Sequence, residues 1–193
     1  SAAFTFKAAG GAGVGEGAWT GAGESGSLWF TDDKLIAGNT TFAHQGFIYD
    51  PDPLSRLEMP SLNLTGGLIS LPPGGYVDVA GDVVVSGSTK ENAGFDIPNG
   101  WFRCGGSLTM NGGHLDVTGG GEVKQERLTV GGDMTLSGAS VTLTCADTDY
   151  NSTACVGGTL TMTNKTTLTL QSPCAAVEGE PGLVFTAGGL EMY

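Results

Sequence analysis

The stretch GGSLTM (105–110) returns as GGDMTL at 131–136 and as GGTLTM at 157–162, so the same six-residue pattern recurs at steps of 26 residues. Each copy begins with a glycine pair, which is a turn signal. The glycines are followed by alternating apolar and polar residues, the period of a half-buried β-strand. A pattern repeated at such a step is typical of repeat architectures. We therefore expect the copies to occupy equivalent places in successive structural units.

Further short strands flank each copy and divide the chain into triplets. One triplet is RLTV (127–130), DMTL (133–136) and VTLT (141–144), and similar triplets start near residues 57, 76, 102 and 154. LWF (28–30), LI (35–36) and TFA (41–43) suggest an earlier turn, and LVFT (183–186) and LEMY (190–193) begin a last one. Triplets at this spacing predict an all-β fold: a single-stack parallel β-helix, or β-solenoid, with coils of about 20–30 residues and three short strands per coil.

Two other architectures fit parts of this pattern. LEMPSLNLTGGL (57–68) resembles a leucine-rich repeat locally, but it lacks the asparagine turn and a helix-forming half. A Greek-key sandwich is the stronger rival, because short strands separated by turn signals suit it equally well. The self-similarity at 26 residues favours the solenoid.

The GGxLTM-type coils across about residues 57–193 resemble the right-handed parallel β-helix proteins. That group includes autotransporter passengers, phage tailspikes, pectin-degrading enzymes and many adhesins. The resemblance is architectural and implies a stacked fold without implying a particular function.

Composition and charge exclude several kinds of partner. The 193 residues include 34 Gly and only eight Lys plus Arg, and the net charge is −12. Nucleic acid and anionic membrane surfaces are therefore not expected as partners, because both require clustered basic residues. No apolar run is long enough to insert into a membrane. GxSxG, P-loop and HExxH motifs are absent, so we expect neither a cofactor nor an enzyme.

Equivalent positions in a solenoid form columns, which carry more information than linear motifs. In the second strand of each triplet, the outward column contains Thr109, Thr135 and Thr161. Stacked threonines pack well on a sheet face, so a structural role is the simpler interpretation. A regular threonine face is also the feature of ice-binding solenoids, but Ser107 and Asp133 interrupt the second rank that such a face needs.

The outward column of the third strand contains Asp96 and Asp116 on adjacent coils. Carboxylates about 5 Å apart could share a calcium ion or act as an acid–base pair. A catalytic site would also need basic neighbours, for which Arg103 and His114 are the candidates. A solvated pair of aspartates is the preferred interpretation, and we assign no metal site.

Cysteines and glycosylation sequons indicate a secreted protein. Of seven Asn, four begin an N-x-S/T sequon, where composition alone gives about one: Asn39, Asn63, Asn151 and Asn164. The four cysteines show no zinc-binding spacing, and their disulfide candidates are Cys145–Cys155 and Cys145–Cys174, with Cys104 expected as a buried thiol in an inward column. We expect an extracellular, secreted, or cell- or virion-surface location.

The two ends of the solenoid suggest contacts with other chains. We divide the sequence into a Gly-rich N-terminal arm (1–27) and a β-solenoid domain (28–193). Sheet edges at the ends of a stack invite pairing with another strand. The expected contacts are FTFK in the arm and the last strand, LEMY: Phe4, Thr5, Phe6, Leu190, Glu191 and Met192.

The leading hypothesis is a secreted structural protein that assembles with itself into an extracellular filament, appendage or coat, through the solenoid ends and the arm. An adhesin that binds glycans, or an ice-binding module using the outward threonine face, is the second hypothesis. A polysaccharide-acting enzyme that uses Asp96 and Asp116 is the third.

Overall fold

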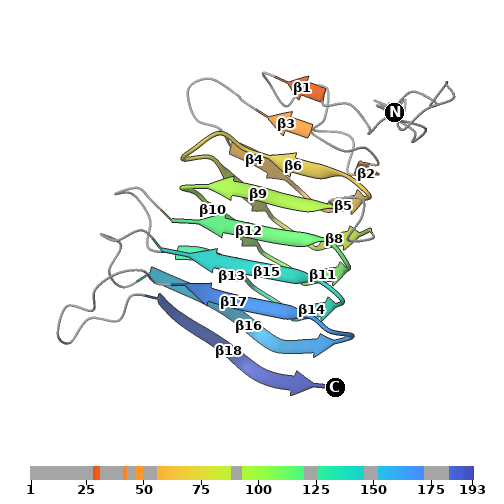
Figure 1. Ribbon diagram of the computed structural model, residues 1–193, viewed down its shortest axis with the longest axis vertical. Coiled ribbons are helices and arrows are strands. Elements are labelled where there is room, and N and C mark those ends of the chain that lie inside the picture. Colours follow the sequence, from red (N-terminus) through yellow and green to blue (C-terminus); the bar gives the residue numbers. More distant parts are fainter. Residues whose placement is uncertain are drawn as a thin grey trace, which may run out of the picture.

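The computed structural model describes residues 28–30, 41–42, 47–49, 56–87, 93–119, 126–145, 152–171 and 183–193, and all its described strands pair in parallel. The strands stack into a β-solenoid with three strands per coil and no helix among the described residues (Figure 1). The fold class predicted from the sequence is therefore confirmed.

Each coil has three faces, named here the first, second and third faces in chain order. The first face contains β4 (Arg56–Met59), β7 (Tyr76–Val79), β10 (Trp101–Cys104) and β13 (Glu126–Val130). The second face contains β2 (Thr41–Phe42), β5 (Leu62–Thr65), β8 (Val83–Ser86), β11 (Leu108–Asn111) and β14 (Met134–Ser137). The third face is a separate sheet of β1 (Leu28–Phe30), β3 (Phe47–Tyr49), β6 (Leu68–Ser70), β9 (Gly94–Pro98), β12 (His114–Thr118), β15 (Ser140–Thr144) and β17 (Thr167–Gln171).

Toward the C-terminal end, the first and second strands of a coil merge. β16 (Ser152–Thr163) and β18 (Leu183–Met192) each run around the corner between the first and second faces as one long strand. The first and second faces therefore belong to one sheet, which is joined through β16. The sequence predicted separate short strands at these places.

The earliest coil differs from the prediction. The expected triplet began with LWF, but β1 pairs with β3 and so belongs to the third face. β2 pairs with β5 and is a second strand rather than a third one. These strands were assigned to the wrong faces because their short apolar runs lack the glycine corner that marks the later coils. In addition, FIY (47–49), which forms β3, was not recognised as a strand. LI (35–36) lies outside the described residues.

The registers confirm the columns predicted for the later coils. On the second face, Met134 lies opposite Leu108 in one neighbouring coil and opposite Leu160 in the other. All three side chains are at most 2% exposed. The interior also includes Phe95 of β9 and Phe102 of β10, whose rings meet edge to face with their centroids 5.2 Å apart. This continuous apolar core fixes the register of the strands that contribute to it, since a slip by one residue would turn their apolar side chains outward.

The repeated glycine pair is explained by close contact between coils. A Cβ atom on Gly131, the first glycine of its pair, would overlap the carbonyl oxygen of Gly105 in the coil before it. A Cβ on Gly132, the second glycine, would lie 2.7 Å from Ser107 Oγ. Real Cβ atoms essentially never approach backbone as closely as one at Gly131 would, so glycine is required there; at Gly132 the nearest atom is a side-chain hydroxyl, and the nearest backbone atoms lie 3.1 Å away.

The residue after the glycine pair forms a polar ladder along the same corner. The amide of Ser107 donates a hydrogen bond of 2.8 Å to Asp82 Oδ1, and the amide of Asp133 donates one of 3.3 Å to Ser107 Oγ. The amide of Thr159 in turn donates a hydrogen bond of 2.8 Å to Asp133 Oδ1. Each of these side chains thus accepts a hydrogen bond from a backbone amide of the following coil, which explains why this position carries a short polar residue.

Candidate functional sites at the open end and on the outward columns

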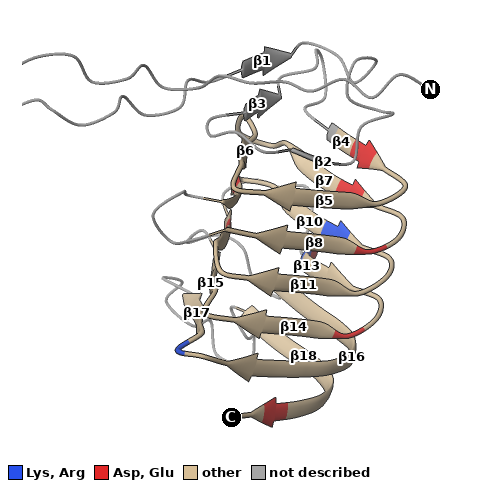
Figure 2. Cartoon of the chain, turned by 90° about the vertical axis from the view of Figure 1, so that its right-hand side faces the viewer, with Lys and Arg blue, Asp and Glu red and all other residues tan. Residues whose placement is uncertain are grey.

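The C-terminal end of the solenoid presents two strand edges. β17 pairs with β15, and β18 pairs with β16, each on one side only within the described residues. Together, their fifteen residues include one charged side chain, Glu191. Protein sheets usually protect such edges with charges, prolines or covering loops. Along the described strands at this end, charge is almost absent (Figure 2).

Apolar core columns reach solvent at this end. Leu190 lies opposite Leu160, and Met192 lies opposite Met162, so both continue columns that are inward in the preceding coils. Leu190 is 63% exposed and Met192 is 69% exposed. Within the described residues, both side chains therefore occupy core positions without the covering layer that the same columns have elsewhere in the stack.

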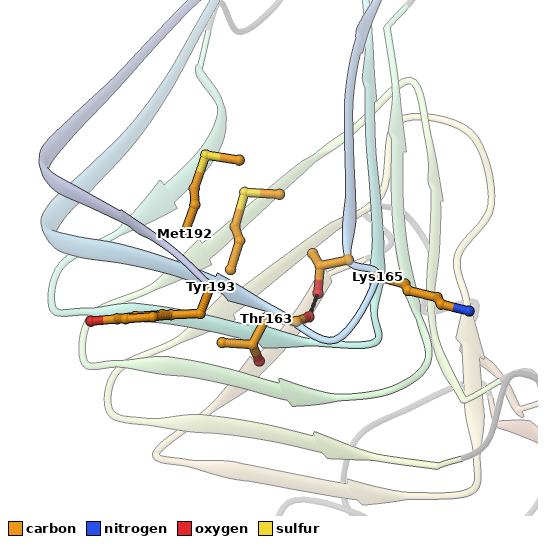
Figure 3. A pocket seen from close by; sticks show the side chains of 6 residues that line it. Thr163, Lys165, Met192 and Tyr193 are labelled. Atoms are coloured by element: carbon orange, nitrogen blue, oxygen red, sulfur yellow. Dashed lines mark hydrogen bonds between the residues drawn. The ribbon is translucent and has the colours of Figure 1, made fainter.

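A shallow cavity of about 290 Å³ opens beside these side chains (Figure 3). Its walls are formed by Met162, Thr163, Lys165, Thr166, Met192 and Tyr193. Thr166 Oγ1 donates a 2.6 Å hydrogen bond to the Thr163 carbonyl oxygen, which closes the turn that begins β17. Lys165 is the one charged residue among them, and its side chain extends away from Met192 and Tyr193 (Figure 3).

The predicted assembly residues divide into two groups. Leu190, Glu191 and Met192 all lie in β18 and are exposed at the open end. Phe4, Thr5 and Phe6, together with the rest of the N-terminal arm, lie outside the described residues. Their role stays a prediction.

On the third face, Asp96 and Asp116 lie opposite each other on β9 and β12, as the columns predicted. His114 Nε2 lies 3.1 Å from Asp96 Oδ1. The hydrogen bond to Asp96 raises the pKa of His114 above its usual value, since it outweighs the opposing effect of partial burial. Asp96, His114 and Asp116 thus form one cluster, and each offers a donor atom within 4.8 Å of the others.

Arg103, the other basic neighbour considered for a catalytic site, is not part of this cluster. It lies on β10 of the first face, where its Nε is 3.1 Å from Asp78 Oδ1 on the preceding coil. Arg103 is therefore not a neighbour of the Asp96–Asp116 pair, because the two faces belong to different sheets. The hypothesis of an enzyme at that pair stays a prediction.

The first face also carries a pair of aromatic side chains that the sequence analysis missed. Tyr76 and Trp101 occupy one outward column and stack with their ring centroids 4.2 Å apart. Tyr76 also donates a 3.2 Å hydrogen bond from its hydroxyl to Glu58 Oε1. Aligning YVDV (76–79) with WFRC (101–104) as equivalent strands of neighbouring coils would have placed these two rings together.

The outward threonines form the expected column. Thr135 lies opposite Thr109 and Thr161, and all three are partly exposed. The neighbouring rank reads Asn111, Ser137 and Thr163, so threonine does not continue across the second face.

Two of the sequon asparagines, Asn63 and Asn164, are exposed. Asn63 is exposed on the outward side of β5. Asn164 occupies the turn before β17 with a φ of 55°, and its side-chain amide donates a 2.8 Å hydrogen bond to Ser137 Oγ. Asn39 and Asn151 lie outside the described residues.

Of the two candidate disulfides, the one between Cys145 and Cys155 is not formed. Cys155 lies between the buried residues Ala154 and Val156, so strand alternation turns its side chain outward, whereas Cys145 is buried. Cys174 lies outside the described residues, so the pairing with Cys145 stays a prediction. Cys104 occupies the expected inward column, opposite Val79 and Val130.

The cysteines should differ sharply in reactivity. Burial raises the pKa of the Cys104 thiol to about 11, and its Sγ lies 3.2 Å from the carbonyl oxygen of Gly81, to which it donates. The thiolate is the reactive form, so we expect iodoacetamide at pH 8 to modify the exposed Cys155 but to leave Cys104 unmodified in the folded protein. Mass spectrometry of the digested protein would measure both rates. Equal rates at the two sites would contradict the burial of Cys104.

No family model, curated protein or solved structure matches this chain. Within the described part of the chain, no helix is long and apolar enough to cross a membrane.

Proposed function

We propose that this chain is a secreted structural protein whose solenoids stack head to tail into a filament, in which the C-terminal end of one copy receives the N-terminal end of the next. The observation that carries this proposal is the exposure of Leu190 and Met192 at inward column positions. Burying such side chains contributes about 25 cal/mol for each Å² of apolar surface removed from water.

The geometry of the open end favours a coil of the same kind as occupant. The edges of β17 and β18 offer unpaired backbone groups in the parallel arrangement that every coil uses. The described coils of a second copy consist of parallel strands with apolar inward residues, the same kind of coil as the one at the open end. Head-to-tail stacking is a heterologous contact, which leaves a free end after each addition and so produces filaments.

The N-terminal arm is the second contact in this proposal. FTFK (4–7) has the alternation of a strand, and strand addition to a sheet edge is a common mode of recognition between chains. The sequons support an extracellular site of assembly. Glycans attached at Asn63 would project from an outward, exposed position on the second face.

The test is the molar mass of the full chain in solution, measured by light scattering across a range of concentrations. We expect large assemblies for the unmodified protein and monomers for Leu190→Lys, because a lysine in the exposed core column would have to be buried on stacking. Thr135→Lys is the matched control: it adds the same charge to an outward column of a middle coil and should leave assembly unchanged. Circular dichroism would verify that both variants keep the β-fold.

Three results would contradict the proposal: a monomer at all concentrations, assembly that survives Leu190→Lys, or assembly that is lost in Thr135→Lys. A discrete dimer would also contradict it, since it would indicate a closed tail-to-tail contact. Deletion of residues 1–27 tests the contact made by the N-terminal arm separately from the contact made by Leu190 at the open end. We expect this deletion to abolish assembly while the coils stay folded.

A further inference from the structure

The third face brings an imidazole and two carboxylates to one point of the sheet. His114 and Asp116 are alternate residues of β12 and point outward together, while Asp96 lies opposite Asp116 on β9. The nitrogen of His114 and the carboxylate oxygens of the two aspartates lie within 4.8 Å of one another. The cluster is partly buried, with the side chains of His114 and Asp96 23% and 42% exposed.

The local sequence explains this convergence. The residue opposite His114 on β9 is Gly94, which has no side chain to occupy the space above the imidazole. The ring can therefore reach diagonally across the strand pair to Asp96. On the other side of β12, Ser140 and Thr142 of β15 lie opposite His114 and Asp116, so small hydroxyl residues border the cluster there.

We propose that Asp96, His114 and Asp116 bind one divalent transition-metal ion, such as Zn²⁺. Zinc bonds to histidine nitrogen and carboxylate oxygen are about 2.0–2.2 Å long, which puts neighbouring ligand atoms on one ion about 3–3.5 Å apart. The 3.1 Å between His114 Nε2 and Asp96 Oδ1 already has this value. Asp116 offers a carboxylate oxygen within 4.8 Å of both atoms.

The imidazole determines the class of metal. Carboxylates alone suit Ca²⁺ and Mg²⁺, but a nitrogen ligand shifts preference toward zinc and its neighbours in the first transition row. All three residues lie in paired strands rather than in loops, which fixes their backbone positions before the ion arrives. This ligand set lies on the third face, so the inference is independent of stacking at the C-terminal end.

The test is isothermal titration calorimetry of the full chain with Zn²⁺ and, separately, with Ca²⁺. We expect His114→Gln and Asp116→Asn each to weaken Zn²⁺ binding at least tenfold. Asp78→Asn, which removes an outward aspartate on the first face, is the matched control and should change Zn²⁺ binding less than twofold. Ca²⁺ should bind at least tenfold more weakly than Zn²⁺ and be unaffected by His114→Gln.

A second measurement locates the ion. The chain has two histidines, so their ring resonances can be followed by NMR and assigned with the His114→Gln variant. Zn²⁺ should shift the His114 resonances and leave those of His44 in place. The proposal is overturned if only His44 responds, if His114→Gln binds Zn²⁺ as tightly as the unmodified chain, or if Ca²⁺ and Zn²⁺ bind equally.

Discussion

Replacing Gly131 by alanine is expected to lower the free energy of unfolding by about 3 kcal/mol, at the upper end of what overpacking usually costs. The new methyl group would overlap the backbone carbonyl oxygen of Gly105. Backbone cannot rotate away as a flexible side chain can, so the two coils would have to separate locally. Chemical denaturation followed by circular dichroism measures the change.

Gly189→Ala is the control for this prediction. Gly189 is the second glycine of the last corner, and an added Cβ would come no closer than 3.2 Å, to Thr159 Oγ1. We expect a loss of less than about 1 kcal/mol there. Similar losses in the two variants would show that the repeated glycines are not required by contact between coils.

Truncating Phe102 to alanine should destabilise the protein by about 4 kcal/mol, the usual range for a large aromatic side chain removed from a core. Phe102 is 1% exposed and meets Phe95 of the third face edge to face, so this pair connects the two sheets across the interior. Its removal would leave a cavity between rigid stacked strands that have little freedom to collapse. Thermal and chemical unfolding would give the size of the loss.

Trp101 provides the matched control, since it is the neighbouring residue on the same strand and points outward. Trp101→Ala removes the stacking contact with Tyr76 but empties no core site, and we expect a loss of about 1–2 kcal/mol. If Trp101→Ala destabilised the protein more than Phe102→Ala, the assignment of inward and outward faces on β10 would be wrong.

The middle and later coils could be predicted from the sequence because two independent signals agree there. Glycine pairs mark the corner between the first and second faces in the coils from residue 105 on, and alternation then assigns each side chain to the inside or the outside. Met134 could be aligned with Leu108 and Leu160 from these signals alone, and the structure has that register. Between residues 28 and 55 the sequence has no glycine pair, and the same reasoning gave β1 and β2 the wrong faces.

The error at Cys145 and Cys155 arose from proximity in sequence. The alternation of inward and outward residues along the strand predicts the correct orientation of Cys155, because an inward Val156 requires an outward Cys155. The pairing of Asp96 with Asp116 followed from the columns, but the approach of His114 to Asp96 did not. That contact is diagonal and depends on the absence of a side chain at Gly94, which a column of residue types does not show.

Negative-stain electron microscopy of the purified full chain tests most directly the claim that the solenoids stack end to end. Stacking predicts unbranched rods as wide as one solenoid, whose length increases with protein concentration and which disappear in Leu190→Lys. Isolated particles the size of one chain at every concentration, or sheets formed by contacts between the outward faces, would contradict it.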